Sequence, residues 1–557
     1  MYDLSYESVT LFKLHILQLL TRNQINIREL RINAPEIMMV VFPDSVTYHR
    51  SRFTTLYKDI YPLASKIFQD FYIDSIKVEH GYMLSSRKAK SGKLNEGEYE
   101  FSAVLRQFSI NKFSFYNKDR VFYARDVDLI IHNYTFSLAD SLYLLTAESV
   151  GFSLTRSELF GKNLVLRPNF GSRALKQANK GIYIQLDVPE FLLQGIDLYQ
   201  VLVEKQVAIE NVDLTGFRLK MFKGKHQQQI HKAKQEEKKI KWVNLFTILQ
   251  GKIQFVSIDT LRIRRASFEY YPSLDASNPE IRVASTDLDL YDFHLDSLSH
   301  LDRDKVLYAD DFELEMNNIS ILLRDGIHGL NTDKIRISTT SSLIDINGTL
   351  LYPDPVQDQI RDKNRINTVY GLFPELTFTG IDIKELYHKR DFNFKRLEIN
   401  EPEIKIIRNR PNKNINARFS KAEDLFSEKN DDVLYQLFHR YLRSIYCEEI
   451  EISHGFLQMN VARQGEKIKV ASGLFSLILY SFLIDSVSGM NTQGYFYSRD
   501  FDFVLDGLHF KKPDGRVNLA AEHLHIKTID SLIEIRNISF IKDDECISDS
   551  LIAKSSA

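Results

Sequence analysis

Three pairs of aspartates are the first candidates for chemistry, and each pair is separated by one residue: Asp126/Asp128, Asp287/Asp289 and Asp500/Asp502. Two neighbouring carboxylates can divide acid and base roles in hydrolysis, or bind calcium. In each pair, however, the aspartates alternate with apolar residues, which is typical of a strand with one solvated face. Because the pattern occurs three times, the sequence favours a structural role over a single active site.

Two pairs of histidines have spacings that could serve a metal ion. His523 and His525 alternate on an expected strand and would share one of its faces, while His226 and His231 lie in a segment rich in lysine and glutamine. A structural zinc site needs four ligands and a catalytic one at least three. No third ligand is evident near His523 and His525, and the other pair is expected in a solvated loop. We therefore expect no metal and no cofactor.

Other catalytic patterns are absent from the sequence. There is no phosphate-binding Gly-x4-Gly-Lys loop, no Gly-x-Ser-x-Gly elbow and no His-Glu-x-x-His helix. Cys447 and Cys546 are the two cysteines, too few for a disulfide scaffold. With 72 basic and 74 acidic residues, the formal charge of −2 excludes a basic module that binds nucleic acid. These observations indicate a protein that is not an enzyme.

The elements that must hold these residues recur along the chain. A stretch that begins at Pro189 matches one that begins at Pro374, at an offset of 185 residues, and the pattern also lies 182 residues earlier. Identity is low, and what recurs is the order of apolar positions. We predict three tandem copies, residues 1–188 with an incomplete start, 189–373, and 374–557 with a truncated end. The recurring positions are Ile25, Ile27, Leu30 and Ile32, then Val207, Ile209, Val212 and Leu214, then Phe392, Phe394, Leu397 and Ile399.

Short helices are expected at matching places in the copies. Residues 198–205 and 383–390 follow Asp197 and Asp382, whose side chains can accept hydrogen bonds from the first helical N–H groups. A second helix is expected later in each copy, after a polar loop. These second helices are predicted at residues 56–68, 243–253 and 433–442.

Most of the remaining sequence has the period-2 alternation of half-buried strands. Between Ile27 and Leu30 the alternation slips by one residue, which predicts a bulge or a tight bend. The uncharged run 473–484 is also predicted to be a strand, because its register matches a stretch in which aspartates alternate with apolar residues. That run is too short for the ~20 residues of a membrane-spanning helix. The fold is therefore predicted to be mainly β with short helices.

The repeated motif resembles the AsmA-like family of bacterial envelope proteins. The resemblance rests on Gly380-Ile381-Asp382, a short helix, the alternating strand 392–399, and Pro402-Glu403-Ile404. The opening residues 2–6 also look like the start of such proteins just after their membrane anchor. The resemblance implies an elongated, curved antiparallel β-sheet groove, related in design to bridge-like lipid-transfer proteins. It also implies an anchor in the inner membrane that is missing from this chain.

From this resemblance we expect a non-enzymatic protein on the periplasmic face of the envelope that shields or conducts phospholipid acyl chains between inner and outer membranes. The groove lining would comprise the recurring apolar positions named above together with Ile404. Phospholipid or another acyl lipid would be the ligand, and an outer-membrane or other envelope protein a further partner. Two alternatives remain open. One is a structural or adhesive β-scaffold with a dry core, and the other is an assembly factor that presents sheet edges to outer-membrane proteins.

Overall fold

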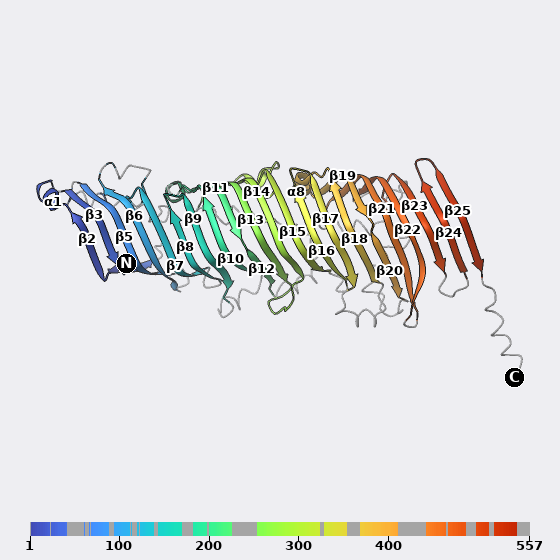
Figure 1. Cartoon of the computed structure of the whole chain (residues 1–557), viewed down its shortest axis with the longest axis horizontal. Helices are drawn as coiled ribbons and strands as arrows, with labels where there is room; N and C mark the ends of the chain where they lie inside the picture. Colours follow the sequence, from blue (N-terminus) through green and yellow to red (C-terminus); the bar gives the residue numbers. More distant parts are fainter. Residues whose placement is uncertain are drawn as a thin grey trace, which may run out of the picture. The chain divides into compact units, whose positions relative to one another are not determined.

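The computed structural model describes residues 2–22, 24–41, 61, 66, 68, 70–88, 94–111, 113, 120–121, 123–138, 143–169, 182–197, 200–224, 253–323, 328–353, 368–409, 442–463, 466–485, 497–511 and 517–542. The chain divides into two compact units. The first comprises Met1–Pro279 with Thr286–Asp310, and the second comprises Glu280–Ser285 with Asp311–Ala557. Figure 1 shows that strands dominate both units.

The strands of the first unit follow one another along a sheet, with α1 (Ile16–Arg22) and the π-helical turn η1 (Gln200–Glu204) between them. β14 (Ile281–Leu295) contributes residues to both units, and a short 3-10 turn, η2 (Ser299–Leu301), follows it. The other strands are β1 (Tyr2–Ser5), β2 (Ser8–Leu14), β3 (Gln24–Asn33), β4 (Glu36–Val41), β5 (Asp70–Lys88), β6 (Leu94–Ile110), β7 (Asp126–Leu138), β8 (Tyr143–Ser153), β9 (Glu158–Pro168), β10 (Ile182–Gln194), β11 (Gln206–Thr215), β12 (Arg218–Lys223) and β13 (Phe255–Tyr271).

The second unit has the same character, with α8 (Ile383–Lys389) as its helix. The run 473–484, predicted as a strand, lies within β22, which confirms that prediction. The strands are β15 (Asp311–Leu322), β16 (His328–Ser338), β17 (Leu343–Pro353), β18 (Thr368–Thr379), β19 (Asp391–Asn400), β20 (Glu403–Asn409), β21 (Ser444–Arg463), β22 (Glu466–Ile484), β23 (Asp500–Lys511), β24 (Val517–Lys527) and β25 (Leu532–Lys542). The prediction of a mainly β fold is confirmed.

The strand pairing is mixed, so the prediction of an antiparallel sheet is wrong. Most neighbours pair antiparallel, but β5 pairs parallel with β3 and β4, β13 with β11 and β12, and β21 with β19 and β20. Parallel neighbours need a crossover connection of a dozen or more residues. The chain supplies one at each of these places, between residues 41 and 70, 223 and 255, and 409 and 444.

Before each of the last two crossovers, two short strands pair end to end with one long strand. β10 pairs with β12 through Ile182–Asp187 and then with β11 through Glu190–Gln194, so β11 and β12 lie end to end along it. Gly216 interrupts them with φ +71, and a Cβ there would lie 3.3 Å from the ring of Pro189. β18 pairs with β19 and β20 in the same way. Proline is tolerated at such a break because no ladder hydrogen bond is needed from it.

The Gly-Ile-Asp motif has one geometry at both places where it occurs. Gly195 and Gly380 have φ of +72 and +67, values that favour glycine. The isoleucines that follow are buried, and the aspartates that come next accept hydrogen bonds from the backbone N–H groups of Gln200 (3.2 Å) and Glu385 (2.8 Å). The expected helix 383–390 is confirmed as α8, whereas η1 is π-helical rather than α-helical. The predicted second helices lie almost wholly outside the described residues, as do His226, His231 and Cys546.

The predicted slip in alternation occurs in both strands of a pair at the same place, so neither strand has an inserted residue. In β3 and β5, Arg28 and Asp74 are left out of the pairing, and the residues after them pair with the same difference in residue number as those before. β11 with β13 and β19 with β21 show the same interruption. The apolar side chains before and after the interruption therefore reach one side. Ile27 and Leu30 pack into the same cluster, as do Ile209 and Val212.

An ion pair between the buried carboxylate of Asp391 and the exposed guanidinium of Arg443 joins the beginnings of β19 and β21. The Arg443 guanidinium donates to both oxygens of Asp391, with 2.7 Å between Nε and Oδ1, and the Ser444 hydroxyl donates to Oδ1 at 2.8 Å. Burial favours the neutral acid, but these hydrogen bonds outweigh that effect and hold the pKa of the Asp391 carboxyl below its usual value.

Replacing Asp391 by asparagine is therefore expected to destabilise the protein in a pH-dependent way. A carboxyl whose pKa is lower in the folded state contributes stability above its unfolded pKa of ~3.9 and loses it as pH falls through the folded value. Denaturant unfolding at several pH values should show the largest difference in the free energy of unfolding between wild type and Asp391→Asn near neutrality. This difference in free energy should decrease below about pH 4. A difference that stays constant down to acid pH would contradict the assignment.

Candidate functional site: the apolar face of the sheet

An unbroken row of apolar side chains crosses ten strands of the second unit. Each member is the direct register partner of the next, so all of them lie on one face of the sheet. We call it the second-unit row. Its members, from β15 to β25, are Met316, Ile335, Ile346, Leu376, Ile399, Ile452, Leu477, Phe503, Ile526 and Ile533.

A corresponding row, which we call the first-unit row, crosses ten strands of the first unit. It begins on β2 and ends on β13, again with each residue paired to the next in register. Its members are Val9, Ile32, Val78, Ala103, Leu129, Phe152, Leu159, Leu193, Val212 and Leu261.

The opposite face carries charges that pair across strands. In the first unit, Arg106 lies 2.9 Å from Asp126 and 2.8 Å from Asp128, and Arg264 lies 2.6 Å from Asp289. In the second unit, Arg396 bridges to Glu398 at 3.1 Å and to glutamates of β21. Ion pairs at this exposure add little stability. The ion pairs show that this face is charged and solvated, whereas the face that carries the rows is apolar.

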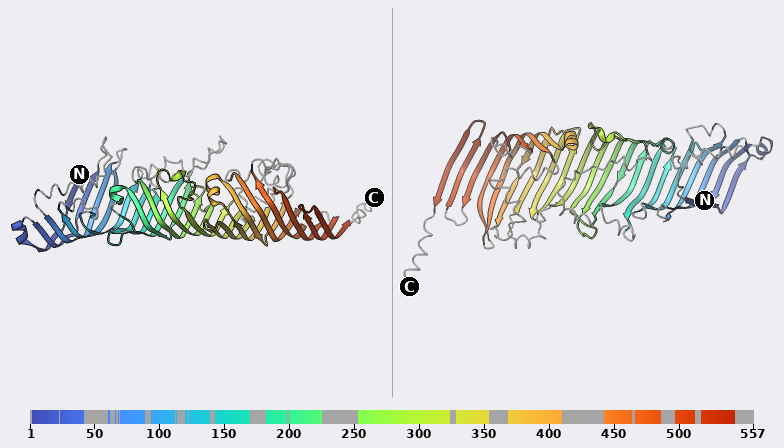
Figure 2. Two further views of the ribbon diagram at one scale, coloured as in Figure 1. Left: turned by 90° about the horizontal axis from the view of Figure 1, so that it is seen from above. Right: turned by 180° about the vertical axis from the view of Figure 1, so that it is seen from behind.

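Little in the described chain covers the row face. Apart from neighbouring strands, the elements that contact one another substantially are α1 with β3, η1 with β11 and α8 with β19. Each of these helices lies next to the beginning of a strand. Val201 of η1 packs into the cluster around Val212 of the first-unit row, but none of the described elements forms a continuous second layer over the rows. Figure 2 shows the strands of both units curving along their length, with the short helices near strand ends. A sheet face this apolar is normally packed against another layer.

The predicted lining residues fall into two groups. Four of the thirteen are buried, namely Ile27, Ile209, Val212 and Phe394. The other nine are half-buried, and among them Ile32 and Ile399 belong to the two rows. The remaining half-buried residues are Ile25, Leu30, Val207, Leu214, Phe392, Leu397 and Ile404.

The buried group lies mostly where a short helix meets its strand. Ile209 packs with Ile196 of the Gly-Ile-Asp motif, and Val201 of η1 lies against the same cluster. Phe394 contacts Phe378 and Phe392, with ring centroids 5.2 and 4.7 Å apart, on the strand that α8 touches. Side chains packed in this way have little surface left for a ligand. A role in holding a ligand remains a prediction for the half-buried group.

The acidic pairs all have protein partners, as a structural role requires. Beyond the ion pairs above, Asp287 accepts a hydrogen bond from the Arg265 backbone at 2.7 Å, and Asp502 lies 2.9 Å from His525. Cys447 is fully buried at an apolar position, and burial raises the pKa of its thiol to about 11. A thiol with that pKa is protonated at neutral pH and is a poor nucleophile.

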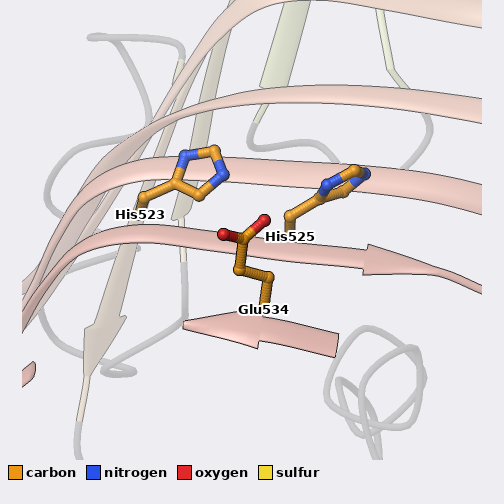
Figure 3. Close-up of side chains that lie close together, drawn as sticks. All are labelled: His523, His525 and Glu534. Carbon is orange, nitrogen blue, oxygen red and sulfur yellow. The ribbon is translucent and has the colours of Figure 1, made fainter. Parts of the chain in front are cut away.

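The sequence analysis missed one cluster of side chains that could bind a metal ion. Glu534 of β25 lies directly across from His525 of β24, so the third potential ligand for the histidine pair comes from the neighbouring strand (Figure 3). The two positions are nine residues apart on either side of a turn. A hairpin prediction across residues 528–531 would have placed them opposite one another.

Comparison with known proteins does not place the chain in a family. No protein-family model matches the chain, and neither does any curated protein. Among solved structures, the crystal structure of the sex pheromone staph-cAM373 precursor covers 52% of this chain and 71% of its own, at 9% sequence identity and a TM-score of 0.10. A TM-score this low carries no argument about fold or function. Within the described residues, no helix has the length and apolar character needed to cross a membrane.

Proposed function

We propose that the protein is a non-enzymatic carrier that holds phospholipid acyl chains on the apolar face of its sheet and conducts them between the membranes of a bacterial envelope. The observation that carries the proposal is the pair of apolar rows, each ten strands long. Ala103 and Val212 of the first-unit row are buried, and no described element forms a continuous second layer over either row. Water against such a face is unfavourable, so an apolar occupant is expected.

The magnitudes suit acyl chains. Each buried CH2 group is worth ~0.8 kcal/mol, so a sixteen-carbon chain would lose roughly 12 kcal/mol in bare water. A continuous apolar surface removes much of that barrier. At the ~4.8 Å spacing of neighbouring strands, each row extends over about 43 Å. One acyl chain spans about half of the ~30 Å hydrocarbon core of a bilayer, so a row is long enough for the whole chain to lie on it.

The finer architecture is part of the proposal. We infer three copies of about 185 residues, joined edge to edge, that form a curved groove of the AsmA-like kind. The matching geometry of Gly195 and Gly380, and the shared interruption at equivalent places in the paired strands, support a repeated unit. Placement at the periplasmic side of the inner membrane rests on the family resemblance.

Within this account the half-buried residues contact lipid and the buried ones hold the sheet together. Ile399 and Ile404 would line the path in the second unit, and Ile32 and Leu214 in the first. The charged face would remain in water and keep the loaded protein soluble.

Mass spectrometry of lipid extracted from the purified full chain tests the proposal. Phospholipid should co-purify in a reproducible ratio to protein and exchange with labelled lipid in vesicles. A protein that is monodisperse and free of lipid would support the dry scaffold instead. Specific crosslinking to a β-rich partner without lipid would favour the assembly factor.

A further inference from the structure

Three side chains at the end of the second unit converge on the charged face of the sheet. His523 and His525 lie two residues apart on β24, and Glu534 projects from β25 toward both of them (Figure 3). One ligand atom from each of the three lies within 4.8 Å of the others. Two atoms bonded to one metal ion at 2.0–2.2 Å lie at most about 4.4 Å apart, so these side chains would draw together on binding.

Two further carboxylates fix the histidine rings from the outside. Oδ1 of Asp506 lies 2.7 Å from Nδ1 of His523, and Oδ1 of Asp502 lies 2.9 Å from Nε2 of His525. An ionised carboxylate only accepts hydrogen bonds, so these two ring nitrogens donate. In the neutral rings, the lone pairs then reside on Nε2 of His523 and Nδ1 of His525.

This arrangement matches the second shell of known metal sites, in which a ligating histidine donates its other N–H to a carboxylate. The Glu534 carboxylate is itself held by Arg536, 2.6 Å away. The side chains of His523 and His525 are 26% and 23% exposed, so an ion could enter from water and keep water as its remaining ligand.

We propose that His523, His525 and Glu534 bind Zn²⁺ or a similar borderline divalent metal ion, with Asp506 and Asp502 as positioning residues. Two imidazoles and a carboxylate suit zinc, copper or nickel better than magnesium or calcium. The site lies on the face opposite the second-unit row, because His523 and His525 alternate with Leu524 and Ile526. It is therefore independent of the proposed lipid function.

The metal ion would hold β25, at the edge of the sheet, to β24. Among the described strands, β25 pairs with β24 alone. Five of its apolar side chains, Ile533, Ile535, Ile538, Phe540 and Ile541, are 52–69% exposed. A strand with so much exposed apolar surface gains little from packing and is prone to detach or to pair with other chains. An ion that joins His523 and His525 to Glu534 links β25 to its neighbour through side chains.

Titration of the full chain, expressed without a histidine tag, with Co²⁺ and then Zn²⁺ tests the proposal. Co²⁺ should give the visible absorption of a low-coordinate nitrogen and oxygen site at a single equivalent, and Zn²⁺ should displace it. Hydrogen exchange should show slower exchange of β25 amides when the metal is bound. The Asp502→Asn variant should bind about 10–100-fold more weakly, as expected for a second-shell partner.

The controls separate this site from chance binding. His525→Asn and Glu534→Gln should lose the absorption while far-UV circular dichroism stays unchanged. His509→Asn, at an exposed histidine of β23 outside the cluster, should bind like wild type. No saturable binding by the wild type, or equal binding by His525→Asn and wild type, would overturn the proposal, whatever lipid the protein carries.

Discussion

Replacing Ile399 by glutamate is expected to strip most of the acyl lipid from the protein while the sheet stays folded. Ile399 is half-buried in the middle of the second-unit row, between Leu376 and Ile452. Lipid lying on the row would desolvate the new carboxylate and lose the contact with isoleucine. Together these effects should cost at least about 2 kcal/mol, or roughly 30-fold in affinity. Without lipid the carboxylate can reach water, so the free energy of unfolding should change less.

The measurement is the ratio of extracted phospholipid to protein, with thermal unfolding of the same samples. Ile399→Lys should behave like Ile399→Glu, because either charge must be desolvated. Thr377→Lys is the matched control. Thr377 lies on the charged face of β18, between Asp345 and Glu398, where a lysine meets favourable partners. Equal loss of lipid in Ile399→Lys and Thr377→Lys would argue against lipid on the row face.

Phe394→Ala, on the same strand, is expected to reduce the stability of the protein while leaving its lipid content unchanged. Phe394 is only 4% exposed and packs against Phe378 and Phe392 next to α8. Truncating a buried phenylalanine leaves a cavity and typically costs 3–5 kcal/mol of stability, so about 3 kcal/mol or more is expected here. Lipid per folded molecule should be unchanged, because this side chain has almost no accessible surface.

Chemical denaturation followed by circular dichroism measures the loss, with Phe510→Ala as the matched control. Phe510 is 37% exposed on β23, so the same truncation there should cost far less. Similar losses at both positions would mean that the cluster beside α8 is not a packed core. Lost lipid in the Phe394 variant at full folding would mean that the buried group contacts the ligand.

Much of the strand pattern could be predicted from the sequence, because alternation reports directly which side chains share a face. The apolar registers near Ile27, Ile209 and Phe394 marked real strands, and Asp382 marked the start of a helix. The parallel pairs could not be predicted in the same way. Alternation is identical in parallel and antiparallel strands, and the deciding feature is a long connection that returns the chain to the same end.

The candidate sites were harder to predict than the strands. Alternation placed Phe394 and Ile399 on one apolar surface but could not separate a residue beneath a helix from one on the uncovered face. That difference depends on where α8 lies in space. Glu534 was missed because its partners lie on the neighbouring strand, so the ligand set becomes visible only when the turn at residues 528–531 is recognised as a hairpin.

Photo-crosslinking from the apolar row tests the central claim most directly. A benzoylphenylalanine at Ile452, whose register partners are Ile399 and Leu477, should form adducts with phospholipid when the protein is irradiated as isolated from cells. The same group at the neighbouring Glu451, on the charged face, should form few or none. Lipid adducts confined to position 452 are the predicted result. Adducts only to protein at position 452, or equal lipid adducts at both positions, would contradict the account.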